Sequence, residues 1–214
     1  MEIIGYHGTK VDFETFVPNT FSLDRMVGPH FSKTPALANR FALRNPGRKG
    51  NGKRTGGRVI PVKLTGSVYT VNQHFADFAG FYSWLHHPDQ GYSLGLFALD
   101  YHAIAHDIGK VVLNERPDLL ARYAQVAGFA DASACLASFE ASRHWQLVSN
   151  LELEADNGLK ADIARAYRDI LVARGYGVLE YVNTAKKEQV GDLADQTCYI
   201  ALHTPRFYFN DAQR

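Results

Sequence analysis

The feature that most constrains the fold is a block at residues 73–170 whose composition differs from both of its flanks. Within it alanine, leucine and histidine are frequent, β-branched runs are scarce, and Pro and Gly divide the stretch into several helices. Strand-like segments occupy 2–6, 28–32 and 59–64 before the block. Further strand candidates follow it at 178–182, 198–202 and 206–209. Strands, a helical block and strands again favour an α+β fold over a doubly wound sheet.

Local signals predict where individual elements begin and end. The first strand is expected to end at His7-Gly8-Thr9, and Thr34-Pro35 suits the N-cap and first position of a helix. Residues 44–58 hold five Gly and six basic residues in fifteen, which predicts a mobile, basic surface loop. A helix is expected over 161–173, closed by a glycine C-cap at Gly175.

Length and charge limit the class of protein. The 214 residues fit a single domain, 1–214, in which the block at 73–170 is an insertion. A net charge of +1 argues against a generally basic nucleic-acid coat, and two Cys cannot build a disulfide scaffold or a four-thiolate zinc site. No run of 18 apolar residues and no charged signal-peptide start is found, so a cytoplasmic protein without a membrane partner is expected, acting in its own cell or delivered into another.

Two segments have the composition of a ligand cleft. In Tyr6-His7-Gly8-Thr9, a histidine at a strand end can direct its imidazole into a cleft while the glycine backbone approaches a ligand closely. In the second, Gly28 and Phe31 precede a small-residue helix that carries Phe41, which predicts an aromatic stacking slot. The alternative interpretations are a structural histidine and ordinary strand–helix packing.

Together these segments resemble the ADP-ribosyltransferase fold of diphtheria toxin and the poly-ADP-ribose polymerases, the His-Tyr-Glu type. Tyr6-His7-Gly8-Thr9 is similar to the end of the family's first strand, and His30 stands eleven positions before Phe41, where the family has a tyrosine eleven positions before a second aromatic. The C-terminal part is similar to transferase domains of phage polyvalent proteins. The resemblance covers roughly 3–71 and 171–209 and implies a split antiparallel β-sheet core.

The resemblance also implies roles for residues of this chain. NAD would be the substrate, and no metal would be needed. His7 would hold a hydroxyl of the adenosine ribose, and the Gly8 backbone would bind the nicotinamide amide. Two aromatic side chains would sandwich the nicotinamide ring. The cleft residues expected from it are Tyr6, His7, Gly8, Thr9, His30, Phe31 and Phe41, with Phe31 able to replace His30 through a register slip.

The catalytic carboxylate has more than one candidate. In the family a Glu holds the nicotinamide ribose and stabilises the positive charge that develops when the glycosidic bond breaks. The local sequence Glu180-Tyr181-Val182-Asn183 favours Glu180. Alignment on the closing strand instead points to Cys198, with Gln196 two residues before it, and Glu188 is a further candidate.

The expected function is mono-ADP-ribosyl transfer from NAD to a protein or nucleic acid, in a bacterial toxin, effector or phage-defence protein with an antitoxin or immunity partner. A catalytically inactive member that binds NAD or a partner is one alternative, and RNA 2′-phosphotransferase chemistry is another.

Three weaker patterns favour structural or solvent-exposed roles over a site. Residues 47–53 nearly match the signature of a phosphate-binding loop, but Arg54 stands where that signature requires Ser or Thr. His102 and His106 could share a helix face but lack a clear third metal ligand. The basic residues at 48–58 form either a solvated loop or a phosphate-contacting patch.

Overall fold

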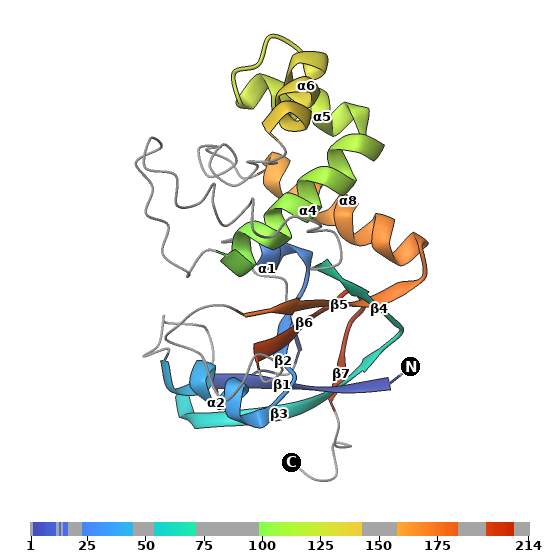
Figure 1. The fold of residues 1–214 in the computed structure, drawn as a ribbon. Helices are drawn as coiled ribbons and strands as arrows, with labels where there is room; N and C mark the ends of the chain where they lie inside the picture. The colour runs from blue at the N-terminus through green and yellow to red at the C-terminus, as the bar shows by residue number, and fades with distance from the viewer. Residues whose placement is uncertain are drawn as a thin grey trace.

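The computed structural model describes residues 2–11, 13, 15–16, 23–44, 54–71, 99–142, 158–183 and 196–207. Within these ranges a single mixed sheet is overlaid by helices (Figure 1). The strands are β1 Glu2–Val11, β2 His30–Ser32, β3 Arg54–Thr65, β4 Ser67–Thr70, β5 Tyr176–Val182, β6 Thr197–Ala201 and β7 Arg206–Phe207. The helices are α1 Leu23–Val27, α2 Pro35–Arg44, α4 Leu99–Glu115, α5 Pro117–Val126, α6 Ala132–Ser142 and α8 Gly158–Ala173.

The sheet curls back on itself because of how two strands are joined. Its order is β4-β5-β6-β2-β1-β3-β7, so four strands separate β3 from β4. Only Gly66 links these two strands along the chain. Gly66 has φ +115°, and a Cβ there would lie 2.7 Å from Cα of Gly177 at the start of β5. Glycine is required at this bend, since a side chain would be strained and would collide with the neighbouring backbone.

The curl gives the sheet two different faces, each with its own core. The inner face is lined by Phe31, Val62, Leu64, Val178, Tyr199 and Ala201, all buried. The opposite, helix face carries Leu179, Tyr181, Cys198 and Ile200, which pack with the helices. Alternate residues of β5 and β6 therefore belong to different cores, as the period of two in a strand requires.

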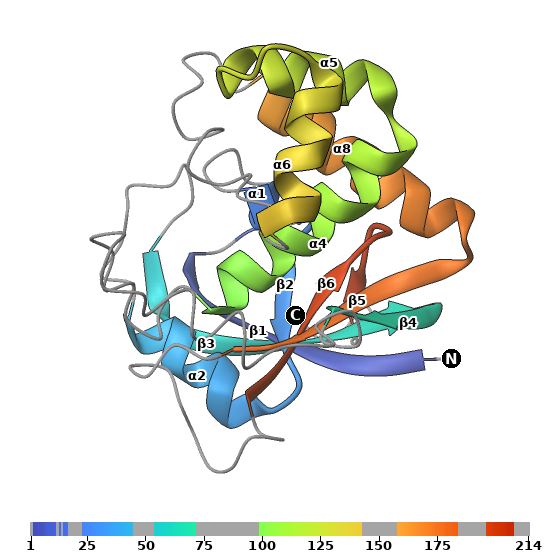
Figure 2. The same cartoon turned by 45° about the horizontal axis from the view of Figure 1, so that its top comes forward.

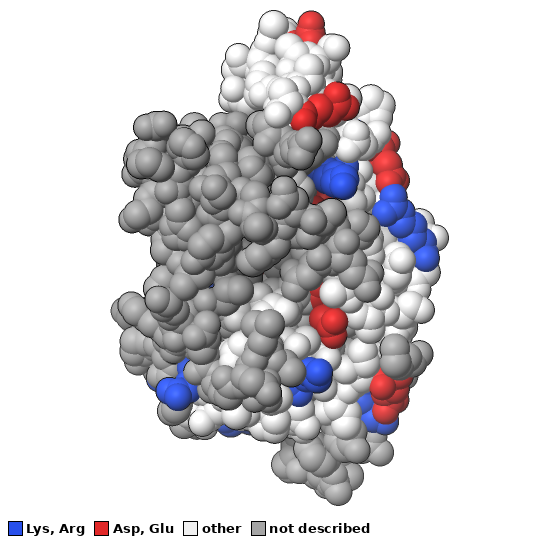
Figure 3. Space-filling view, in the orientation of Figure 1, with Lys and Arg blue, Asp and Glu red and all other residues white. Residues whose placement is uncertain are grey.

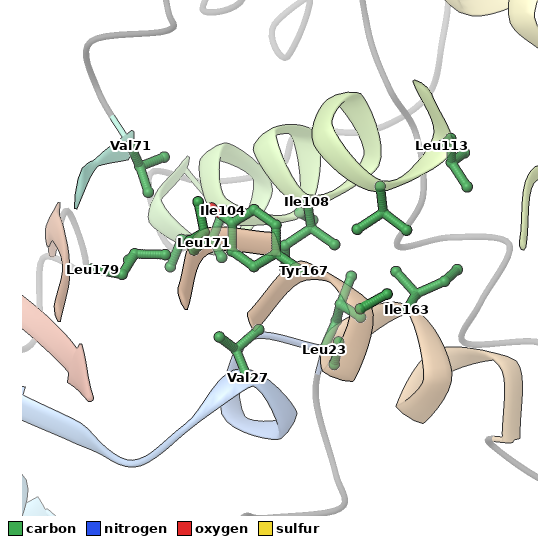
Figure 4. Close-up of a cluster of buried hydrophobic side chains, with 14 of the residues drawn as sticks. Leu23, Val27, Val71, Ile104, Ile108, Leu113, Ile163, Tyr167, Leu171 and Leu179 are labelled. Carbon is green, nitrogen blue, oxygen red and sulfur yellow. The ribbon is translucent and has the colours of Figure 1, made fainter. Parts of the chain in front are cut away.

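A layer made mainly of α1, α4, α5, α6 and α8 lies above the helix face (Figure 2). Side chains from α1, α4, α8 and the strands converge in its core, including Val27, Ile108, Tyr167 and Leu179 (Figure 4). The α4 carboxylate of Asp107 is buried there and accepts hydrogen bonds from the hydroxyls of Tyr69 and Tyr167. This buried group ties the helical layer to β4, because it accepts from one tyrosine of β4 and one of α8.

The α+β class is confirmed at the level of a mixed sheet with a helical layer. The helix after Thr34 is also confirmed, since the Thr34 hydroxyl accepts a hydrogen bond from the Leu37 amide (3.3 Å). The C-cap prediction is confirmed by Gly175, which follows α8 with φ +88°. No helix of the described residues is long and apolar enough to cross a membrane.

Two predictions were wrong, on the end of the first strand and on a wholly antiparallel sheet, and a third, on the loop at 44–58, was wrong at its ends. The first strand continues past His7 to Val11, because β3 pairs with it as far as Val11 opposite Arg54. The predicted loop 44–58 begins in α2 and ends in β3, and residues 45–53 lie outside the described ranges. The sheet is not wholly antiparallel, since β4 and β5 run parallel. In the helical block, residues 72–98 and 143–157 lie outside the described ranges.

Candidate functional site

One row of side chains crosses the inner face of the sheet. The register places Ile60 opposite His7, Phe31 opposite Tyr199, Tyr199 opposite Glu180, and Glu180 opposite Thr70. The pairing of Tyr6 with Ser32 continues to His7 and Phe31, whose ring centroids are 5.8 Å apart. Directly opposed residues point to the same side of a sheet. The row therefore brings together three predicted site residues that are distant in sequence: His7, Phe31 and Glu180.

Two hydroxyl groups hold the carboxylate at one end of this row. The Thr70 hydroxyl donates to Oε1 of Glu180 at 3.3 Å. The Tyr199 hydroxyl is hydrogen-bonded to the same carboxylate, and burial followed by the charge of Glu180 raises the pKa of Tyr199 to about 12. Tyr199 is therefore protonated at neutral pH and acts as a donor. A partly exposed carboxylate with two fixed donors is well oriented to face a developing positive charge.

His7 is held at the other side of the row in a defined tautomer. Its Nδ1 lies 3.0 Å from the backbone oxygen of His30 and must donate to it, because a carbonyl only accepts. Burial, followed by the effect of His30, lowers the pKa of His7, although the hydrogen bond acts in the opposite direction. The neutral ring then offers Nε2 as an acceptor, and Nε2 makes no hydrogen bond with the described residues.

Phenylalanine rings enclose His7. Phe13 and Phe16 meet it edge to face at 5.5 Å and 5.2 Å, and Phe16 also contacts Phe31 and Phe207. These apolar contacts account for the lowered pKa of His7. They also place an aromatic surface beside the row.

His30 lies on the helix face, opposite to the row. Its Nδ1 is 2.8 Å from the Tyr181 hydroxyl, and its Nε2 is 3.6 Å from Oδ2 of Asp24, a distance longer than a hydrogen bond. Desolvation lowers the pKa of His30 more than the neighbouring Asp24 raises it. The neutral His30 ring therefore carries its proton on Nε2, which faces the Asp24 carboxylate. Its Nδ1 accepts a hydrogen bond from the Tyr181 hydroxyl.

Gly8 and Phe41 also belong to the helix face. A Cβ on Gly8 would lie 1.8 Å from the backbone oxygen of Ala38 in α2, so the absence of a side chain lets the helix touch β1. Phe41 is partly buried against the helical core. Strand alternation places Tyr6 on this face as well, and Thr9 on the same face as His7. The structure does not bring His30 and Phe41 together with the row.

The other candidates for the carboxylate position have different surroundings. Cys198 is buried in the helical core opposite Tyr181. Gln196 is buried, and its backbone oxygen accepts from the Asn183 amide. Glu188 lies outside the described residues.

Charges of both signs lie close together on the described part of the face drawn in Figure 3. Figure 3 shows basic and acidic side chains interspersed along the helical layer, in agreement with the ion pairs Arg122–Asp162 and Arg116–Asp118. Of the predicted basic segment, residues 48–53 lie outside the described ranges, and Arg58 belongs to β3 opposite Thr9. The described ranges contain no cluster of three or more residues able to ligate a metal.

Sequence reasoning missed Thr70, Tyr199 and Phe16 as neighbours of the site. Alternation within β5 and β6 could identify which residues share a face, but only the register puts Tyr199 and Thr70 opposite Glu180.

Comparison with known proteins gives no relative: no family model matches the chain, and neither a curated protein nor a solved structure matches it significantly.

Proposed function

We propose that this chain is a mono-ADP-ribosyltransferase that uses NAD as its donor and a macromolecule as its acceptor. The observation that carries the proposal is the row on the inner face, where His7, Phe31 and Glu180 share one surface although the chain separates them widely. Strand spacings of about 4.8 Å put His7 and Glu180 about 14 Å apart along the sheet. That separation fits residues that hold different ribose units of one dinucleotide.

The chemistry follows from these positions. The bond between the nicotinamide nitrogen and the ribose carbon breaks, its electron pair leaves with nicotinamide, and the ribose gains oxocarbenium character. Glu180 stabilises this charge, and its carboxylate accepts a hydrogen bond from a ribose hydroxyl. Nε2 of neutral His7 accepts from a hydroxyl of the adenosine ribose. A nucleophile of the acceptor then forms the new bond to the ribose carbon and loses its proton to water.

The aromatic partner of the nicotinamide differs from the one expected. Phe31 belongs to the row, whereas His30 and Phe41 lie on the helix face, which favours the register slip from His30 to Phe31. The split-sheet core of the family is part of the proposal, supported by the curl at Gly66. The target and any antitoxin or immunity partner are inferred from the resemblance alone.

The test is nicotinamide release and label transfer from NAD, with whole-cell lysate as the source of acceptor. Glu180→Gln keeps the size of the side chain but removes its charge, and transfer should fall by about a hundredfold or more. Glu140→Gln on the exposed face of α6 is the matched control and should be unaffected. Wild-type protein that binds NAD yet releases no nicotinamide would contradict the proposal.

That outcome would support a second candidate, a catalytically inactive NAD-binding or partner-binding protein. The observation favouring it is the enclosure of His7 by Phe13, Phe16 and Phe31, which occupy space around the ring. Calorimetry and nicotinamide release together distinguish the two, because an inactive binder takes up NAD but releases no nicotinamide, whereas the transferase does both.

A further inference from the structure

A groove with a volume of about 360 Å³ opens beside the row, at the ends of β2 and β6. Gly28 and Pro29 border it just before β2, and Ala201 to Pro205 border it at and after the end of β6. Ala201 stands two residues beyond Tyr199 on β6, about 7 Å along the strand. Phe16 lines the groove and also contacts His7 and Phe31, so one ring separates the groove from the candidate site.

Three polar side chains in this groove have unused hydrogen-bonding capacity. They are Arg168 from α8, and His203 and Thr204 from the turn after β6. Among the described residues, Arg168 has one partner, the adjacent Asp169, at 3.7 Å, which is too long for a hydrogen bond. His203 and Thr204 make no side-chain interaction with the described residues. The groove thus gathers a guanidinium whose ion pair with Asp169 leaves it without a hydrogen bond, and an imidazole and a hydroxyl with no hydrogen bond to the described residues.

The lining selects the charge of a ligand. No carboxylate is among the described residues that line the groove. The Asp169 side chain points largely to solvent, being 65% exposed, whereas that of Arg168 is 33% exposed. A guanidinium fork that shares one lining with two further potential donors is suited to the oxygens of a phosphate group.

The rest of the lining selects the size and kind of the ligand. A volume of about 360 Å³ is at the lower end of the range for small-molecule pockets, which holds a single nucleotide better than a whole dinucleotide. Phe16, Pro29 and Pro205 supply partly exposed apolar surface, and the ring of Phe16 is suited to contact with a base.

We propose that this groove is a phosphate-binding site that takes a mononucleotide-sized phosphomonoester, with the phosphate held by Arg168, His203 and Thr204 and the base near Phe16. The site uses residues other than the row, so it is separate from the NAD site and does not depend on the transferase proposal. If the chain transfers ADP-ribose, the groove lies where a phosphate-bearing acceptor would reach the inner face.

The experiment is calorimetric titration of the full chain with inorganic phosphate, AMP and adenosine. AMP should bind more tightly than phosphate, and adenosine should bind about tenfold or more weakly than AMP, since it lacks the charged group. Phosphate binding as tightly as AMP would assign the groove to the free anion and overturn the nucleotide part. Adenosine binding as tightly as AMP would overturn the phosphate site.

Arg168→Met tests the location, with Arg165→Met as the matched control. Both residues lie on α8, but Arg165 is 61% exposed and paired with Asp162. Arg168→Met should weaken AMP binding about tenfold or more, whereas Arg165→Met should leave it within about twofold. Melting temperatures of both variants establish that each is folded. Equal AMP affinity in the two variants would overturn the proposal.

A final titration separates the groove from the proposed NAD site. AMP is titrated again with NAD at a saturating concentration, and the affinity for AMP and the effect of Arg168→Met should both persist. Exclusion of AMP by NAD would assign the groove to the dinucleotide and overturn a separate site. A chain that binds AMP through Arg168 but does not turn over NAD would refute the transferase while leaving the groove intact.

Discussion

Tyr199 lies directly opposite Glu180 across the β5–β6 ladder, and its hydroxyl is hydrogen-bonded to the Glu180 carboxylate. On the other side of β5, Thr70 is opposite the same residue and donates to Oε1. The carboxylate is therefore fixed by donors from both neighbouring strands. A group oriented in this way needs little rearrangement when charge develops in front of it.

The first prediction concerns the Tyr199 donor. Tyr199→Phe removes the hydroxyl and keeps the buried ring, so kcat for nicotinamide release should fall about tenfold with KM little changed, the scale of one hydrogen bond to a charged group. Tyr176→Phe, on the same strand as Glu180, is the control. Steady-state kinetics on both variants checks this, and equal kcat values would show that Tyr199 only fills space.

The second prediction separates the roles of the two ring nitrogens of His7. His7→Asn keeps a donor near the position of Nδ1 for the His30 carbonyl, so stability should be nearly retained while turnover is lost. His7→Gln places its amide near the position of Nε2, so it should keep more activity but lose about 1 kcal/mol of stability. Urea unfolding and nicotinamide release measure the two effects. The reverse pattern would make His7 structural only.

The third prediction is a loss of stability in mild acid that depends on His30. Burial lowers the pKa of His30 from 6.5, so below pH 6.5 the unfolded chain binds a proton more readily than the folded one. The contribution of His30 to the free energy of unfolding is therefore fully present above that pH. It falls as the pH decreases, by at most about 1.4 kcal/mol per pH unit.

This slope is measured by urea unfolding between about pH 7.5 and 5.5, a range that spans the ordinary histidine pKa of about 6.5. His30→Gln cannot take up the proton, so its stability should change less steeply with pH than that of wild type, whatever its absolute value. Parallel curves for the two proteins would mean that His30 is not the group responsible.

The fourth prediction concerns Gly8 as a packing residue. Gly8→Ala would place Cβ 1.8 Å from the Ala38 oxygen, so α2 must move away from β1 and the protein should lose several kcal/mol of stability. Gly57→Ala, facing Ala42 of the same helix at 3.3 Å, should be tolerated far better. Thermal unfolding compares the two variants, and a stable, folded Gly8→Ala protein would contradict the close contact between α2 and β1.

Sequence alone determined the elements whose signals are local. The N-cap at Thr34, the C-cap at Gly175 and the period of α8 depend on neighbours within a few residues, so they are readable without the fold. His7 and Glu180 were also predicted as candidate site residues, from a motif and from a resemblance to a known family. The predicted strand end at His7-Gly8-Thr9 was wrong, because pairing with β3 extends β1 to Val11, beyond its own sequence signal.

Only the tertiary structure decided which predicted residues share a surface. His30 and Phe31 are adjacent in sequence, yet one lies beside Tyr181 on the helix face and the other beside Tyr199 on the inner face. A shift of one residue in register would exchange them, and register is set by long-range pairing and by the bend at Gly66. Those interactions join segments that are far apart in the chain, so no local pattern in the sequence determines them.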